Sequence, residues 1–232
     1  MQTSIRPSEQ STQLHEYGDN FYRFLASFAV RSAEQIIPVL NALLPINSVV
    51  DFGCGQGAWL SVWRKAGAKV TGVDGPYVDQ QHLMIGADEF RGADLSRTID
   101  LGRRFDVVQS LEVAEHLPSS RASEFIGTLT SHGPLVMFSA AVPGQGGEHH
   151  INEQPLEYWR KSFASTDTLR LITCARKSSQ ISRFSIGTAT TLSSTQRKLI
   201  SQLCRIRCVR SEFPRTRGYL IIGRCPTASI MQ

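Results

Sequence analysis

The chain lacks the marks of an exported or membrane-spanning protein. Residues 1–20, MQTSIRPSEQSTQLHEYGDN, are polar and contain no apolar stretch like that of a signal peptide. No apolar run is long enough to cross a bilayer. No cysteine lies in a CxxC pair, which is typical of reduced thiols in a cytoplasmic protein. We therefore expect a cytoplasmic protein without a membrane span. The cysteines are Cys54, Cys174, Cys204, Cys208 and Cys225.

Acidic side chains are scarce toward the C-terminus. Residues 165–232 hold 12 Lys and Arg against 2 Asp and Glu, a net charge of +10, whereas residues 1–164 hold 13 against 18, a net charge of −5. The overall charge of +5 would suggest a nucleic-acid or anionic-membrane partner, but it belongs to the tail alone. Because the rest of the chain is acidic, a nucleic-acid partner is not expected.

Alternating apolar segments predict an α/β fold with a Rossmann-like, doubly wound and mostly parallel sheet. Period-3.6 spacing of apolar residues predicts a helix over residues 20–44, which Pro38 is expected to kink or split. In such sheets, ligands bind beyond the carboxyl ends of the strands. Strands are predicted within 47–53, 69–75, 89–95, 104–113 and 134–144, and further helices within 58–67 and 121–133.

A glycine-rich turn follows the first predicted strand. The segment DFGCGQG places an acid, Asp51, ahead of Gly53, Gly55 and Gly57. Glycines allow a tight turn and close approach of the backbone to a ligand. An acid here would repel a pyrophosphate but attract a cation. Asp74 ends the second strand, where a carboxylate can accept both hydroxyls of a ribose, and Asp94 ends the third. These acids suit S-adenosylmethionine, which carries a positive sulfonium and no phosphate.

At these residues the chain resembles the class I S-adenosylmethionine-dependent methyltransferases, over about residues 47–163. The resemblance is strongest to a bacterial group of stand-alone methyltransferase domains. It implies that Asp51 and the glycine turn lie near the methionine end of the cofactor, Asp74 on the ribose and Asp94 near the adenine, with Leu111 also at the cofactor. It also implies a sheet of seven strands. The motifs that carry it are GVDGxYVD at 72–79, SLEVAEHL at 110–117, FSAAxPGQGG at 138–147 and HxNEQ…YW at 150–159.

A cluster of carboxylates and imidazoles follows the fourth predicted strand, where a methyl acceptor should approach. If a helical turn begins there, the spacing of Glu112, Glu115 and His116 places them on one face. With His149 or His150 from the loop after the next strand, they could bind Mg²⁺, Mn²⁺ or Zn²⁺. His116, His149 or His150 could instead act as a general base without a metal. In a third interpretation the two glutamates only favour the start of a helix, and His116 packs.

The tail departs from the resemblance. We divide the chain into a disordered N-terminus (1–16), a methyltransferase domain (17–164) and a divergent basic segment (165–232). The family should end in an antiparallel hairpin, for which residues 170–174 and 219–225 are candidate strands. The intervening sequence raises the hypothesis of a frameshifted end of the same domain, because a shifted frame of residues 186–191 can encode Trp-Tyr-x-His-Asn, a segment like one the family usually carries near this distance. A genuine divergent tail is the alternative.

The predicted function is methyl transfer to an oxygen atom of a small molecule or glycan. Glu115, His116, His149 and His150 are the candidate catalytic residues, and Glu112, Glu115, His116 and His150 the candidate metal ligands. Similar E-V-x-E-H segments occur in methyltransferases that act on quinone precursors and on the terminal 2′-hydroxyl of small RNAs. A metal-assisted RNA 2′-O-methyltransferase is therefore one alternative. A degenerate protein that binds the cofactor without turnover is another. The sequence leaves the oligomeric state open.

Overall fold

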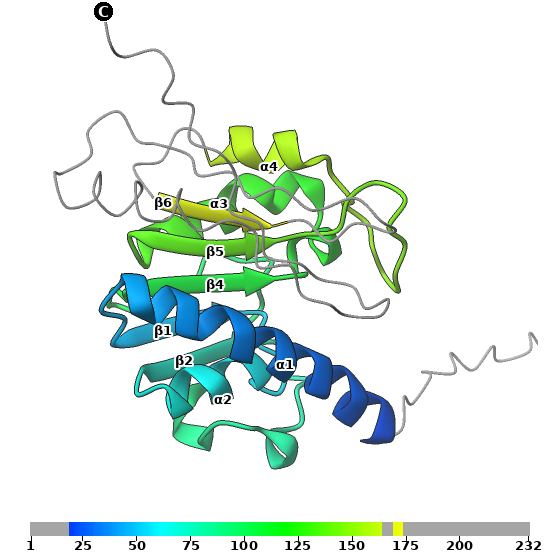
Figure 1. Cartoon of the computed structure of the whole chain (residues 1–232). Helices are drawn as coiled ribbons and strands as arrows, with labels where there is room; N and C mark the ends of the chain where they lie inside the picture. The colour runs from blue at the N-terminus through cyan, green and yellow to red at the C-terminus, as the bar shows by residue number, and fades with distance from the viewer. Residues whose placement is uncertain (1–18, 164–168, 174–232) are drawn as a thin grey trace, which may run out of the picture.

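A parallel β-sheet forms the centre of the fold (Figure 1). The computed structural model describes residues 19–163 and 169–173. The strands lie in the order β3-β2-β1-β4-β5-β6, and every neighbouring pair runs parallel. The predicted α/β class is confirmed. The strands are β1 (Ser48–Phe52), β2 (Lys69–Asp74), β3 (Phe90–Gly92), β4 (Val107–Leu111), β5 (Leu135–Ser139) and β6 (Leu169–Thr173).

Helices cover both faces of this sheet. The long helix α1 and the helix α2 contact each other on one face, while α3 and α4 contact each other on the other. Short 3₁₀ turns connect these elements at the carboxyl edge of the strands and nearby. The helices are α1 (Asp19–Leu43), α2 (Ala58–Lys65), α3 (Ala122–Ser131) and α4 (Leu156–Ser162), and the 3₁₀ turns are η1 (Gln80–His82), η2 (Ala87–Glu89), η3 (Ala114–His116) and η4 (Ser119–Arg121).

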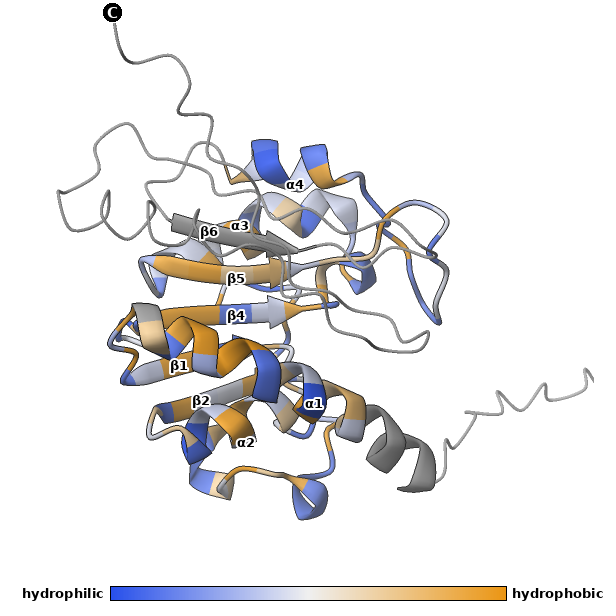
Figure 2. Cartoon of the chain, viewed as in Figure 1, coloured by the Kyte–Doolittle hydropathy of each residue, from blue (hydrophilic) through white to orange (hydrophobic). Residues whose placement is uncertain are grey.

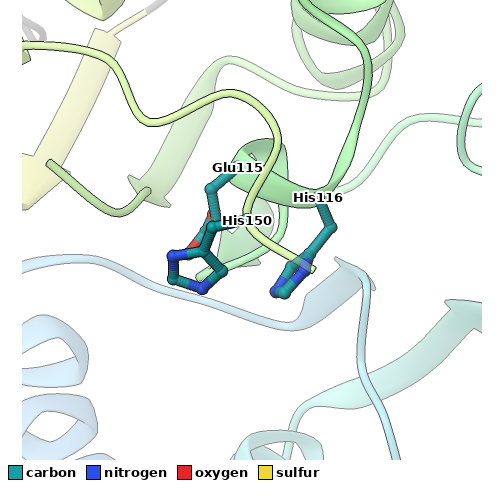
Figure 3. A group of neighbouring side chains, drawn as sticks. All are labelled: Glu115, His116 and His150. Carbon is teal, nitrogen blue, oxygen red and sulfur yellow. The ribbon is translucent and has the colours of Figure 1, made fainter. Parts of the chain in front are cut away.

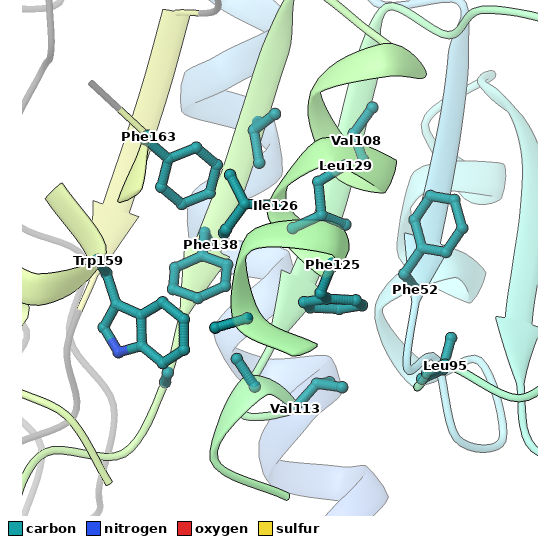
Figure 4. Close-up of a cluster of buried hydrophobic side chains, with 14 of the residues drawn as sticks. Phe52, Leu95, Val108, Val113, Phe125, Ile126, Leu129, Phe138, Trp159 and Phe163 are labelled. Atoms are coloured by element: carbon teal, nitrogen blue, oxygen red, sulfur yellow. The ribbon is translucent and has the colours of Figure 1, made fainter. Parts of the chain in front are cut away.

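Two hydrophobic cores result, one on each face. Strand residues alternate between them: Val49 and Val107 pack under α1 and α2, whereas Val50 and Val108 pack under α3 and α4. Figure 2 shows apolar residues along β1 and β5 and on α1. Because both faces are covered, these strands are near-continuous apolar runs, as in other parallel sheets. Figure 4 shows the second core, in which Phe138 lies 5.2 Å, between ring centroids, from both Trp159 and Phe163.

The structure differs from the sequence-based expectations in the continuity of α1 and in the pairing of the last described strand. Pro38 is exposed and lies within a continuous α1, so of the two expected effects, a kink or a split, the split does not occur. The expected strand near residues 170–174 exists as β6, but it pairs directly and in parallel with β5. Its expected partner at 219–225, the N-terminal residues 1–16 and the segment 186–191 lie outside the described residues. In the part of the chain that the structure describes, no helix is long and apolar enough to span a membrane.

Candidate active site

The turn between β1 and α2 requires glycine for two different reasons. Gly53, Gly55 and Gly57 have φ values of +89°, +52° and +82°, in the left-handed region that side chains disfavour. A Cβ on Gly53 would also overlap Cγ2 of Val113, and one on Gly57 would lie 3.1 Å from Cγ1 of Ile85. A Cβ on Gly55 would meet nothing within 4 Å. Gly55 therefore borders open space, whereas its two neighbours are packed.

Asp74, at the end of β2, is buried and bonded to this turn. Its Oδ2 accepts a hydrogen bond from the backbone N–H of Gly55 at 2.6 Å. Its Oδ1 accepts from the N–H of Gly75 at 2.7 Å and from the hydroxyl of Tyr77 at 2.8 Å. The carboxylate thus ties the glycine turn to the end of β2. In the described part of the chain, one acceptor position on Oδ2 has no donor.

Asp51, near the end of β1, is a buried carboxylate with one unpartnered oxygen. Oδ2 accepts a hydrogen bond from Nε2 of Gln109 at 2.7 Å, while Oδ1 has no partner within residues 19–163 and 169–173. Burial, with a smaller contribution from the nearby charge of Asp74, raises the pKa of Asp51 to about 7. Two buried carboxylates so close together favour a cation, because a positive ligand would offset both the desolvation and the mutual repulsion.

The other two predicted cofactor residues have less distinctive surroundings. Asp94 is exposed, and its Oδ1 accepts hydrogen bonds from the backbone N–H and the hydroxyl of Ser96, while Oδ2 lies 3.3 Å from Nε of Arg97. These hydrogen bonds lower its pKa. Leu111 ends β4 and packs partly buried against the core beside α1 and α2. Both residues lie beyond or at the carboxyl ends of strands, as expected.

Glu115, His116 and His150 come together beyond the ends of β4 and β5 (Figure 3). The first two belong to η3, and the third to the loop that joins β5 to α4. Their candidate ligand atoms all lie within 4.8 Å of one another. The two imidazole rings are 4.9 Å apart between centroids, at an interplanar angle of 81°. Three of the four predicted metal ligands therefore form a cluster.

Acceptor groups determine the tautomers of both imidazoles. Nδ1 of His116 lies 3.3 Å from the carbonyl oxygen of His149, and Nδ1 of His150 lies 2.9 Å from Oε1 of Glu153. Because a carbonyl or a carboxylate can only accept, each Nδ1 carries the proton in these contacts. The Nε2 atom of each neutral ring then has a free lone pair. Burial, together with His150, lowers the pKa of His116, which favours this neutral form.

The carboxylate of Glu115 is completely buried, and neither oxygen has a hydrogen-bond partner among the residues that the structure describes. Burial first, and then the charge of Glu112, raise its pKa to about 7, while the nearby backbone amides of Glu115 and Ala141 oppose the rise only in part. The loop between β5 and α4 holds η3 in place, since the carbonyl of Glu115 accepts hydrogen bonds from the N–H groups of Ile151 and Asn152. An unpartnered buried carboxylate beside two imidazole lone pairs can take a cation or a proton.

Glu112 and His149 are not in this cluster. Glu112 precedes η3 and has a φ of +58°, so the helical spacing that was to align it with Glu115 does not apply. Its Oε2 instead accepts a hydrogen bond from Nε2 of Gln145 at 3.0 Å. His149 is exposed, has a φ of +56° and contributes its carbonyl to His116. The prediction that Glu112 shares one helical face with the other two residues is wrong, because no helical turn includes it.

Sequence reasoning missed three polar residues that hold the site. Gln109 is completely buried and bonds Asp51, Tyr77 bonds Asp74, and Glu153 bonds His150. Only Gln109 could have been identified from the sequence. A glutamine in the middle of the apolar run DVVQSL needs hydrogen-bond partners for its amide inside the core. The roles of the other two depend on loop conformations that have no periodic pattern.

The sequence profile of a family described as a methyltransferase domain matches residues 13–173, more than half of the chain. The chain belongs to this methyltransferase-domain family. This membership confirms the resemblance to methyltransferases that the four motifs indicated. A comparison with curated protein sequences finds no match.

Several solved methyltransferase structures are similar to this chain. One is an amino pentose methyltransferase from Micromonospora echinaspora, at 19% identity over 50% of this chain and 52% of that chain, with a TM-score of 0.41. This methyltransferase thus spans about half of that protein's length. Another is the magnesium protoporphyrin IX methyltransferase of Synechocystis PCC 6803, at 21% identity over 73% of this chain and 88% of that chain, with a TM-score of 0.46. An O-methyltransferase family protein from Burkholderia thailandensis has 15% identity over 72% and 59%, with a TM-score of 0.48. At these identities the likeness is one of fold alone.

Proposed function

We propose that this methyltransferase transfers a methyl group to a hydroxyl of a small molecule or glycan, with a divalent cation held by Glu115, His116 and His150. The observation that carries the proposal is the Glu115 carboxylate, fully buried with both oxygens unpartnered and within 4.8 Å of two imidazoles. Such a carboxylate is costly unless a cation or a proton accompanies it.

The residues around the glycine turn fit S-adenosylmethionine. Asp51 has a free, buried oxygen that suits a positive group, and Gly55 leaves its ligand side open. Asp74 is placed at the end of β2, where it can accept ribose hydroxyls. The cofactor supplies an activated methyl group on a positive sulfonium. We assign Asp51 to its methionine end, Asp74 to the ribose, and Asp94 with Leu111 to the region of the adenine.

The donor set of the Glu/His cluster fits a transition-metal ion better than magnesium. Imidazole nitrogens suit Zn²⁺ and similar ions, whereas Mg²⁺ prefers oxygen ligands, so we expect Mn²⁺ or Zn²⁺. Three protein ligands would leave positions open for an acceptor. A bound cation would lower the pKa of an acceptor hydroxyl and orient it. Glu153 would hold the ring of His150, as partners of ligating histidines commonly do.

The same residues could remove the acceptor's proton without a metal. In that case the free Nε2 of His116 or His150 is the general base, and Glu115 would stabilise the imidazolium formed. The acidic body of the chain, with a net charge of −5 over residues 1–164, supports a small-molecule or glycan acceptor over RNA. An oxygen acceptor is favoured because it is the kind of nucleophile that requires this assistance.

The test is an acceptor screen with labelled S-adenosylmethionine, with and without a chelator, together with Mn²⁺ titration followed by the loss of the free-ion EPR signal. We expect saturable Mn²⁺ binding that Glu115→Gln abolishes. Glu157→Gln, an exposed glutamate on α4, is the matched control and should bind normally. Turnover that persists in the presence of a chelator, with no Mn²⁺ binding, would contradict the metal and favour a histidine as general base. Turnover on RNA alone would overturn the acceptor class.

A further inference from the structure

A buried hydrogen-bonded chain connects the core under α2 to the cofactor-side carboxylate of Asp51. Nε1 of Trp63 donates to Oε1 of Gln109 at 3.1 Å, and Nε2 of Gln109 donates to Oδ2 of Asp51 at 2.7 Å. Trp63 and Gln109 have no exposed surface, and Asp51 is 3% exposed. All three polar groups are therefore removed from water, and each depends on its neighbour in the chain for a partner.

The sheet register explains why these side chains meet. Asp51 on β1 is the register partner of Gln109 on β4, so their side chains point to the same face of the sheet. That face is the one covered by α1 and α2, from which Trp63 extends. The next strand continues the row with Met137, the register partner of Gln109 on β5. The amide thus lies between an indole and a carboxylate, with an apolar residue on its other side.

The indole dictates which way the amide points. An indole N–H can only donate, so the oxygen of Gln109 must face Trp63 and its NH₂ group must face Asp51. The reversed amide would place an acceptor against the carboxylate and leave the indole unpaired. The hydrogen-bonded chain therefore delivers a donor to Oδ2 of Asp51, and no described residue bonds to Oδ1. A buried carboxylate held in this way presents a single oxygen to a ligand.

We propose that Gln109 is a positioning residue for the cofactor, and that with Trp63 it aims Asp51 at the ammonium group of the methionine moiety. This inference rests on the proposed placement of the cofactor at Asp51. The donor from Gln109 favours the charged carboxylate and so opposes burial and the charge of Asp74, which raise the pKa of Asp51. Only the ionised form can pair with an ammonium group.

Two ligands separate this role from a structural one. S-adenosylhomocysteine carries the α-ammonium group, and 5′-methylthioadenosine retains the adenosine and the sulfur but lacks the amino-acid moiety. Gln109→Met keeps the size and removes the amide. By calorimetry we expect about a 10-fold loss of affinity for S-adenosylhomocysteine and a change within about 2-fold for 5′-methylthioadenosine. Equal losses for both ligands would overturn the proposal.

Control variants and a spectrum of the unaltered protein distinguish a loss of positioning by Gln109 from a folding defect. Met137→Leu, beside Gln109 in the same layer, should leave both affinities unchanged. Trp63→Phe should weaken the binding of S-adenosylhomocysteine by a smaller factor than Gln109→Met does. Like Gln109→Met, it should leave the binding of 5′-methylthioadenosine within about 2-fold. In the unaltered protein, the indole N–H resonance of Trp63 should shift with S-adenosylhomocysteine and stay in place with 5′-methylthioadenosine. If neither variant folds, this spectrum decides, and a shift with both ligands or with neither contradicts the proposal.

Asp51→Asn tests the placement on which the inference depends. We expect this variant to lose affinity for S-adenosylhomocysteine. Unchanged affinity would mean that the cofactor's ammonium group is not at Asp51, and the proposed site would fail. A loss in Asp51→Asn without any loss in Gln109→Met would instead reject the role of Gln109 alone.

Discussion

The hydroxyl of Tyr77 donates a hydrogen bond to Oδ1 of Asp74 at 2.8 Å, although the tyrosine as a whole is 82% exposed. The N–H of Gly75 donates to the same oxygen, so both of its lone pairs are used. A Cβ on Gly75 would overlap the Tyr77 ring, which shows how closely the ring lies over the backbone. The two hydroxyls of a ribose would therefore have to compete with Tyr77 for Asp74.

Tyr77→Phe should strengthen cofactor binding. The change removes the competing hydroxyl and keeps the ring, so we expect about a 10-fold gain in affinity for S-adenosylhomocysteine, the scale of one hydrogen bond to a charged group. Isothermal calorimetry gives this number directly. Tyr158→Phe on α4 is the matched control and should change nothing. A weaker complex would show that the hydroxyl of Tyr77 binds the cofactor.

Substitutions of Asp74 and of Glu115 should affect cofactor affinity and turnover differently. Asp74→Ala removes an acceptor assigned to the ribose, and roughly a 100-fold loss of S-adenosylhomocysteine affinity is expected from two hydrogen bonds to a charged group. Glu115→Ala should leave this affinity within about 2-fold while turnover falls by about 100-fold or more. Calorimetry and an end-point assay with the acceptor measure the two effects. Parallel losses in both variants would contradict the division of roles.

The raised pKa of Asp51 predicts an unusual dependence of stability on pH. Its pKa is about 7 in the folded protein, against 3.8 for the ordinary carboxyl, so between these values the folded state holds the extra proton. The free energy of unfolding should fall as pH rises through this window, by up to about 1.4 kcal/mol per pH unit from this residue. Below pH 4 the contribution is fully present, and above about pH 7 it is lost.

Asp51→Asn isolates that contribution, because the amide does not titrate. Denaturant unfolding of both proteins at pH 5, 6, 7 and 8 gives the difference in unfolding free energy. We expect the unaltered protein to lose stability relative to the variant as pH rises, with little change beyond pH 7. A constant difference would show that Asp51 titrates at its ordinary pKa.

Gly53 and Gly55 should tolerate alanine very differently. Both have positive φ, which costs an alanine roughly 1 kcal/mol, but only at Gly53 would the new methyl overlap Val113. We expect Gly53→Ala to lower the melting temperature much more than Gly55→Ala does. Adding Val113→Ala should recover part of the loss in Gly53→Ala and none in Gly55→Ala. Additive effects in both double variants would exclude the overlap as the cause.

The strands and the cofactor edge could be predicted because their signals are local. Near-continuous apolar runs mark buried parallel strands, and parallel strands bring their carboxyl ends to one edge of the sheet. Asp51, the glycine turn and Asp74 follow such runs, so their neighbourhood follows from connectivity alone. Spacing was a poor guide beyond β4, where Glu112 precedes a 3₁₀ turn and does not join a helical face.

The sequence by itself determined the α/β class, the family and the residue types available at the carboxyl edge, because apolar periodicity and short motifs encode them locally. Only the tertiary structure decided how those residues are paired. It directs Gln109 onto Asp51 through the register of β1 and β4, and places His150 beside Glu115 while His149 remains exposed. The physical reason is that side-chain direction and burial depend on neighbours distant in the chain, which no local pattern specifies.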